Sequence, residues 1–258
     1  MSVQACADIV AKGDPDRFAA AMAAPVEARQ VLFPLYAFNV EIAHAPWVTQ
    51  EPMIAEMRLQ WWRDALEEIG RGGPVRMHEV ATPLAKIIGA DGAAILDRLV
   101  QSRRWDVYRD GFKSENHFSE YLDATGGGLM WASALTLGAD RTAESSEADA
   151  EKAVRRFGRA TAFVRFMQAV PALTARGCKP LLDAGVETIT AFARFHLSEI
   201  EPEKALWRAL AAAARPALLE SWQTHPLLRQ IARDPSRVAA GRVGLSPIRK
   251  KLRLLRWS

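Results

Sequence analysis

The segment from Phe157 to Leu173 restricts the fold more than any other part of this chain. It reads FGRATAFVRFMQAVPAL, is apolar almost all round a helix, and contains no Asp or Glu. A helix with so little polarity normally lies at the centre of a protein, covered by other helices. Sustained period-two alternation and the dipeptides of tight hairpins are nearly missing from the sequence. We therefore predict an all-α fold with this segment in its interior.

Helix signals cover most of the chain, with boundaries set by proline, glycine and polar turns. Pro34 lies inside a helical pattern, so a kink or short break is expected there. The polar segment 139–147 is expected to be a surface loop in which Ser145 or Ser146 caps the next helix. No long linker divides the chain, which favours a single domain over residues 1–258. The predicted helices span 2–12, 15–23, 26–45, 52–70, 81–90, 92–108, 115–138, 147–175, 181–200, 203–223 and 246–256.

The composition excludes several classes of protein. A net charge of +4, spread evenly, is too mild to indicate a nucleic-acid partner. No run of eighteen apolar residues predicts a membrane-spanning helix, and the first turns are too charged for a secretory signal. Cys6 and Cys178 have no paired spacing and suit a reducing compartment. We expect a cytoplasmic location, or a peripheral one at the inner face of the membrane.

Five segments, taken in order, resemble the squalene/phytoene synthase family over nearly the whole chain. The first begins with Leu35-Tyr36-Ala37-Phe38, and the second, Met57–Ile69, contains a Trp-Trp-Arg cluster. The remaining three are the glycine-containing segment 118–138, the apolar segment 157–173 and the closing segment LSPIRKKLRLLRWS. The resemblance implies a single-domain helical bundle of the isoprenoid-synthase type around a central apolar cavity.

In that family, aspartates on the first and fourth of these segments hold Mg²⁺ and a prenyl diphosphate. Hard cations such as Mg²⁺ need carboxylate oxygens, and Mg²⁺ offsets the charge of the departing diphosphate. Aligned on the shared residues, the aspartate positions carry no acidic side chain. The resemblance therefore implies no catalytic residue, no metal site and no cofactor here, with Mg²⁺ required only if the chain is an active prenyltransferase. The positions are Ala43, His44, Trp47, Ala169 and Leu173.

The sequence is closer to a divergent branch of the family. That branch includes the mitochondrial respiratory complex I assembly factor of squalene/phytoene-synthase type. The AFNVE of the first segment and Pro171 near the end of the fourth resemble that branch. The resemblance implies a retained fold without demonstrated synthase chemistry, and a protein partner in respiratory-complex assembly.

Three groups of residues are expected to line the cavity. Gly126, Gly127 and Gly128 cost about 1 kcal/mol each in a helix, which indicates close helix approach or room for a ligand, unless they form a loop. Arg165 lies on an apolar helix, so it either faces solvent or pairs with a carboxylate such as Glu41. The first helix contributes Asn39, Glu41, Ala43, His44 and Trp47; the second contributes Ala162, Arg165, Phe166, Ala169 and Leu173.

Glu41, His44 and the other histidines do not form a recognised metal-binding motif. Glu41 and His44 form one ExxH pair, but di-iron bundles need two such pairs, and no second pair is present. The histidines are scattered, without the spacing of a zinc site. A polar pair on the cavity wall is the better interpretation of Glu41 and His44.

The C-terminal helix predicted over 246–256 is basic and amphipathic. Ile248, Leu252 and Leu255 form an apolar stripe, and no acidic residue follows Asp234. The stripe either packs on the protein core, which we favour, or contacts an anionic membrane surface. The residues expected to take part in either contact are Arg249, Lys250, Lys251 and Trp257.

Three functions remain open from the sequence. The favoured one is a non-catalytic homologue that binds a prenyl lipid or quinone tail or acts in respiratory-complex assembly. The second is an active prenyltransferase that joins two prenyl diphosphates head to head with unusual ligands. The third is an interaction scaffold whose cavity is filled by side chains, namely Trp47, Phe163, Phe166 and Met167.

Overall fold

The computed structural model is built of helices only, across the part of the chain that it describes. Those residues are 2–49, 51–108, 110–139, 147–181, 185–200 and 210–257. The prediction of an all-α, single-domain bundle is confirmed. The expected loop at 139–147, with its cap at Ser145 or Ser146, falls almost entirely outside the described residues.

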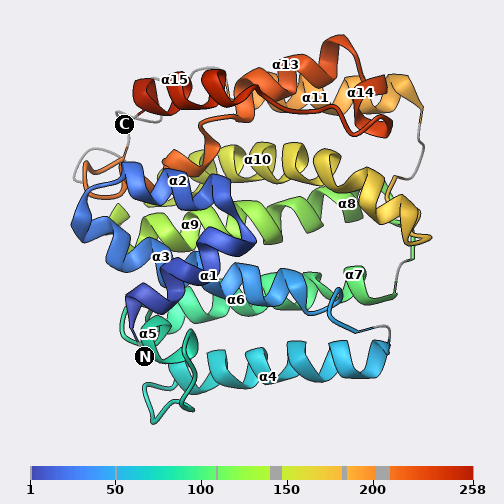
Figure 1. Ribbon diagram of the computed structural model, residues 1–258. Coiled ribbons are helices and arrows are strands. Elements are labelled where there is room, and N and C mark those ends of the chain that lie inside the picture. The colour runs from blue at the N-terminus through green and yellow to red at the C-terminus, as the bar shows by residue number, and fades with distance from the viewer. Residues whose placement is uncertain are drawn as a thin grey trace.

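The helices stack in layers (Figure 1). Contacts run from α4 through α6, α9, α10 and α11 to α13, so α4 and α13 lie at opposite ends of the stack. The bounds of the longer helices are α1 Val3–Gly13, α2 Pro15–Ala23, α3 Val26–His44, α4 Pro52–Gly70, α6 Ala90–Ser102, α8 Glu115–Leu122, α9 Gly128–Thr136, α10 Glu147–Ala175, α11 Val186–Ile200, α13 Thr224–Arg233 and α15 Pro247–Trp257. The short ones are α5 Ala81–Leu84, α7 Arg104–Tyr108, α14 Ser236–Ala239, the π-helical turn η1 Asp123–Gly127 and the 3₁₀ helix η3 Arg215–Ser221.

Helix α10 is the central helix that the apolar segment 157–173 predicted. It contacts α8, η1, α9, α11, η3, α13 and α14, so most of its surface is covered. Phe163 and Met167 are almost fully buried, and Gln168 is one of its few exposed side chains in that segment. Burial of this many apolar groups on one helix explains why the segment lacks carboxylates.

The three consecutive glycines form part of a helix, so the loop interpretation is wrong. Helix α8 passes through η1 into α9 without leaving the helical conformation. The backbones of η1 and α10 are nearly in contact there. A Cβ atom on Gly126 would lie 2.4 Å from the Ala162 Cβ, and one on Gly158 would lie 2.5 Å from the Gly126 carbonyl oxygen. Glycine at both positions therefore permits this close approach.

Several predicted boundaries differ from the structure. Helix α3 continues through Pro34 without a break, the helix expected at 81–90 ends at Leu84, and the one expected at 92–108 is divided into α6 and α7. Of the helix expected at 203–223, residues 201–209 lie outside the described part, and η3 is a 3₁₀ helix that starts at Arg215-Pro216. Pro226 lies in the first turn of α13, where a missing backbone N–H costs nothing.

Substitution Gly158→Ala tests the close approach of η1 and α10. The added methyl group would overlap the backbone of Gly126 and Gly127, so we expect the free energy of unfolding to fall by ~1–3 kcal/mol or more. Gly73→Ala is the matched control, because a Cβ atom added there would have no other atom within 4 Å, and we expect a change below about 0.5 kcal/mol. Urea denaturation measures both, and equal midpoints for the two variants would contradict the packing described.

Candidate ligand-binding cavity

A cavity of about 250 Å³ opens between α3, α8, η1, α10 and the turn that joins α1 to α2. Residues from helices far apart in the sequence meet on its wall. Most of the residues that the sequence placed there line it. They are Asn39, Ala43, His44 and Trp47 from α3 and the loop after it, Gly126 from η1, and Ala162, Arg165, Phe166, Ala169 and Leu173 from α10.

Three of the predicted wall residues lie elsewhere. Successive residues of a helix are rotated by about 100°, so Glu41 points away from the side of α3 that carries Asn39 and Ala43. Gly127 faces Asp123 and Arg155, and Gly128 faces Ile95, so only Gly126 of the three glycines reaches the cavity. The expected polar pair of Glu41 and His44 is therefore not formed on the cavity wall.

The cavity is less apolar than the sequence indicated. Its wall also carries six polar or charged residues that sequence reasoning missed: Asp14, Arg17, Arg103, Asp106, Tyr121 and Thr125. Only Asp14 had a local signal, since it precedes Pro15 and caps α2 by accepting a hydrogen bond from the Arg17 backbone N–H at 3.0 Å. Arg17, Arg103 and Asp106 lie in segments whose pattern is that of an ordinary solvated surface, and Tyr121 and Thr125 lie in the glycine-containing segment 118–138 without a signal of their own.

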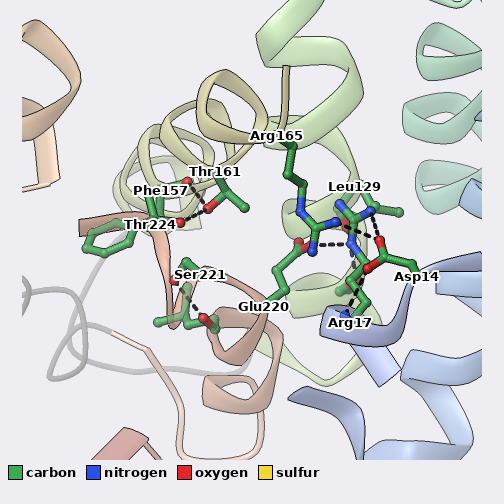
Figure 2. A network of polar contacts seen from close by, with 11 residues as sticks. Asp14, Arg17, Leu129, Phe157, Thr161, Arg165, Glu220, Ser221 and Thr224 are labelled. Carbon is green, nitrogen blue, oxygen red and sulfur yellow. Dashed lines mark hydrogen bonds and ion pairs between the residues drawn. The ribbon is translucent and has the colours of Figure 1, made fainter. Parts of the chain in front are cut away.

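A buried ion-pair network centred on Arg17 forms one side of the cavity (Figure 2). Arg17 Nε donates to Glu220 Oε2 at 2.5 Å, and Arg17 Nη1 donates to Asp14 Oδ2 at 3.0 Å. Only 7% of the Arg17 side chain and 1% of the Glu220 side chain are exposed. A buried guanidinium is tolerated only when carboxylates compensate its loss of hydration, so these two acids are required by Arg17.

Arg165 joins this network from α10. Its Nη1 atom donates to Asp14 Oδ2 at 2.7 Å, so its partner is Asp14 rather than Glu41. Burial alone would raise the pKa of Asp14, but the charges of Arg165 and Arg17 outweigh burial and lower that pKa from 3.8 to about 2. Asp14 is therefore ionised at any physiological pH, with its charge already matched by two arginines.

A second cluster faces the cavity from α7 and α8. Arg103 Nη1 donates to the Tyr121 hydroxyl oxygen at 2.8 Å and to Asp106 Oδ2 at 3.2 Å, and the Tyr121 hydroxyl lies 3.1 Å from Asp106 Oδ1. Burial raises the pKa of Asp106, although Arg103 and Tyr121 oppose that rise. Both carboxylates on the cavity wall are thus held by arginine.

Apolar side chains form much of the remaining wall, and they do not fill the cavity. Trp47 and Phe166 line the open space, whereas Phe163 and Met167 are buried in the core behind it. An arginine, Arg176, lies over the Trp47 ring at 3.9 Å and fixes its position. The prediction of an interaction scaffold with a filled cavity is therefore met only in part. Aromatic side chains fill the neighbouring core, and the cavity remains open.

The residues of this cavity do not fit a magnesium site. The positions that the resemblance aligns with the synthases' aspartates all lie on the wall and carry no carboxylate; they are Ala43, His44, Trp47, Ala169 and Leu173. The described ranges contain no group of three or more His, Cys, Asp or Glu side chains placed to hold a metal ion. A Mg²⁺ ion bound here would have to take Asp14 or Asp106 from arginine.

Comparison with known proteins gives a family match over most of the chain. The model of the family described as "Squalene/phytoene synthase" matches residues 10–241.

Curated relatives are similar over a shorter stretch. The mouse and human proteins named "NADH dehydrogenase (ubiquinone) complex I, assembly factor 6" are each 25% identical over 168 residues, which is 64% of this chain and 48% of theirs. The homologue of that assembly factor in Drosophila melanogaster is 27% identical over 173 residues, 64% of this chain and 50% of its own. The chain thus matches about half the length of these relatives.

Solved structures share the fold at low sequence identity. A dehydrosqualene synthase crystallised with a ligand superposes with a TM-score of 0.78 at 14% identity, over 99% of this chain and 94% of the other. Squalene synthase HpnC from Alicyclobacillus acidocaldarius gives a TM-score of 0.67 at 12% identity, over 91% of this chain and 94% of the other. At such identities the likeness concerns the fold alone.

Substitution Asp14→Asn tests the ion-pair network. Asparagine caps a helix as well as aspartate does, so the variant removes the charge and keeps the cap of α2. Because the folded-state pKa of about 2 lies below the unfolded value of 3.8, the carboxylate stabilises the fold above about pH 4. Its contribution, about 2 kcal/mol, is lost as the pH falls from about 4 to about 2.

The stability of wild type and variant is compared by urea denaturation at several pH values. We expect the variant to be less stable at pH 7 and the difference to shrink toward pH 2. A difference that stayed constant with pH would contradict the charge pairing of Asp14 with Arg165 and Arg17.

Proposed function

This chain belongs to the squalene/phytoene synthase family, and we propose that it keeps the family's fold but does not transfer prenyl groups. The observation that carries the proposal is the occupation of both wall carboxylates by arginine. Asp14 binds Arg165 and Arg17, and Asp106 binds Arg103. Departure of a diphosphate needs divalent cations to offset its charge, and this cavity offers them no free carboxylate.

We further propose that the cavity binds the polar end of an isoprenoid or quinone ligand. A volume of about 250 Å³ is below the ~300–1,000 Å³ of typical small-molecule sites, and therefore too small for two prenyl chains together. Arginine and tyrosine on one side and Trp47 and Phe166 on the other suit a molecule with one polar and one apolar end.

The cellular role proposed is assembly of a respiratory NADH dehydrogenase complex. Its support is the name of the curated relatives, which are complex I assembly factors, together with the loss of metal-binding residues that a synthase would need. Such a role requires a protein partner and a place beside the membrane that carries the complex. The alternative, an active head-to-head prenyltransferase, predicts a different outcome in the first experiment below.

Incubation with farnesyl or geranylgeranyl diphosphate and Mg²⁺ tests the absence of catalysis. We expect no pyrophosphate release above the background without protein, because no carboxylate is available to gather Mg²⁺. A dehydrosqualene synthase assayed in parallel shows that the conditions detect turnover. Magnesium-dependent release by this chain would instead establish the prenyltransferase.

Deletion of the gene in its own organism tests the role in assembly. The amount of assembled NADH dehydrogenase complex on native gels is expected to fall severalfold and to recover with the wild-type gene. Ala169→Phe fills the cavity from α10, and Ala172→Phe places the same side chain on an exposed position of that helix. We expect Ala172→Phe to restore the complex and Ala169→Phe to fail.

Two results would count against these proposals separately. An unchanged amount of complex after deletion would remove the assembly role. Full recovery with Ala169→Phe, in a variant shown to be folded, would mean that the cavity needs no ligand for that role.

A further inference from the structure

Helix α15 has two faces, and the structure shows which one the protein covers. Lys250, Arg253, Leu254 and Trp257 are half-buried, and the helix is attached to the bundle through them. The opposite face is exposed. The expectation that the apolar stripe of this helix packs on the core is therefore wrong.

The covered face is held mainly by polar contacts. Lys250 Nζ donates to Asp16 Oδ1 of α2 at 2.8 Å, and Arg253 Nε donates to the Trp222 carbonyl oxygen. Leu254 and Trp257 pack against the core. Because these residues recur with helical spacing on one side, they fix the rotation of α15 about its axis.

That rotation turns the apolar stripe to the outside. Ile248 is 72% exposed, Leu252 is 58% exposed and Leu255 is 75% exposed. Because successive residues of an α-helix are rotated by about 100° about its axis, Arg249 and Arg256 flank this stripe on one side and Lys251 flanks it on the other. All three of these basic residues are exposed.

The part of the chain that carries α15 is poor in negative charge, and Asp16 of α2, which does lie beside this helix, is paired with Lys250. Residues 210–257 contain only two acidic residues, Glu220 and Asp234. Glu220 is buried against Arg17, and Asp234 pairs with Arg237. The exposed apolar stripe and its flanking cations therefore belong to a segment whose acidic residues are already paired with other arginines.

We propose that α15 docks this protein on an anionic membrane surface. Ile248, Leu252 and Leu255 enter the boundary between head groups and acyl chains, while Arg249, Lys251 and Arg256 contact lipid phosphates. This arrangement is the one by which an amphipathic helix lies in the plane of a membrane interface. The contact is at the surface, since no helix in the described ranges is long and apolar enough to cross a bilayer.

Charge complementarity favours an anionic lipid surface over a second copy of this chain. A second copy of this chain would bring the same cations against each other, and like charges oppose association. The proposal does not depend on the proposed function, because a membrane-docked chain is compatible with either assembly or catalysis.

Co-sedimentation of the full chain with lipid vesicles tests the proposal. We expect binding to vesicles of phosphatidylcholine mixed with phosphatidylglycerol, weak binding to phosphatidylcholine alone, and loss of binding as NaCl is raised. The variant Arg249→Gln/Lys251→Gln/Arg256→Gln is expected to bind the anionic vesicles about a hundredfold more weakly, since each surface cation contributes about a tenfold factor or less. Ile248→Ser/Leu252→Ser/Leu255→Ser is expected to bind at least about tenfold more weakly.

A matched control removes three positive charges from a part of the surface away from α15. Arg58, Lys86 and Arg98 are exposed, and two of them lie on α4 and α6, far from α15 in the stack (Figure 1). The variant Arg58→Gln/Lys86→Gln/Arg98→Gln is expected to bind as the wild type does. Thermal unfolding followed by circular dichroism verifies that each variant is folded.

Three results would overturn the proposal. The first is equal binding to neutral and anionic vesicles, and the second is equal weakening by the control and the α15 charge variant. The third is self-association of the wild type in analytical ultracentrifugation, abolished by the serine variant, without any binding to vesicles. That third result would identify the exposed stripe as an interface between two copies of the chain.

Discussion

Arg17 is buried between Asp14 and Glu220, and much of the cavity depends on how its charge is compensated. Removing a guanidinium from water is costly, so both carboxylates have to remain beside it. Asp14 also binds Arg165, which ties the turn between α1 and α2 to the central helix α10. The same interactions that hold these helices together occupy an acidic group that could otherwise bind a cation. The proposed lack of a metal site and the packing of these helices would thus have one physical cause.

The fold of the family survives this change because its packing does not require the aspartates. Helix α10 approaches η1 at Gly126 and Gly158, where backbone meets backbone, and this contact does not involve the positions that carry aspartates in the synthases. Those positions hold small or apolar side chains such as Ala43, Ala169 and Leu173 on the cavity wall. Aromatic residues including Phe163 fill the core behind it. A bundle can therefore keep its architecture while its cavity becomes small and internally neutralised.

The sequence predicts the parts of the structure that depend on local periodicity. The apolar pattern of 157–173 predicted the central helix, and the resemblance to the synthase family implied that Ala43 and Ala169 line the same cavity, as they do. The ion pairs could not be predicted, since Arg17 and Glu220 are separated by 203 positions and neither lies in a distinctive pattern. The side of α15 that faces solvent could not be predicted either, because it is set by contacts of Lys250 and Arg253 with residues distant in the sequence. Glu41 was misplaced because a cluster of polar residues was assigned to one face without regard to helical phase.

The most direct test of the central claim is a crystal of this protein soaked with Mn²⁺ and a non-hydrolysable analogue of farnesyl diphosphate. Anomalous scattering from manganese locates any bound ion, whether or not turnover occurs. We expect no manganese between α3 and α10, with Asp14 still bound to Arg165 and Arg17. Manganese seated between these two helices, with Asp14 or Asp106 turned from arginine to the metal, would contradict the claim that arginine has taken the place of the metal.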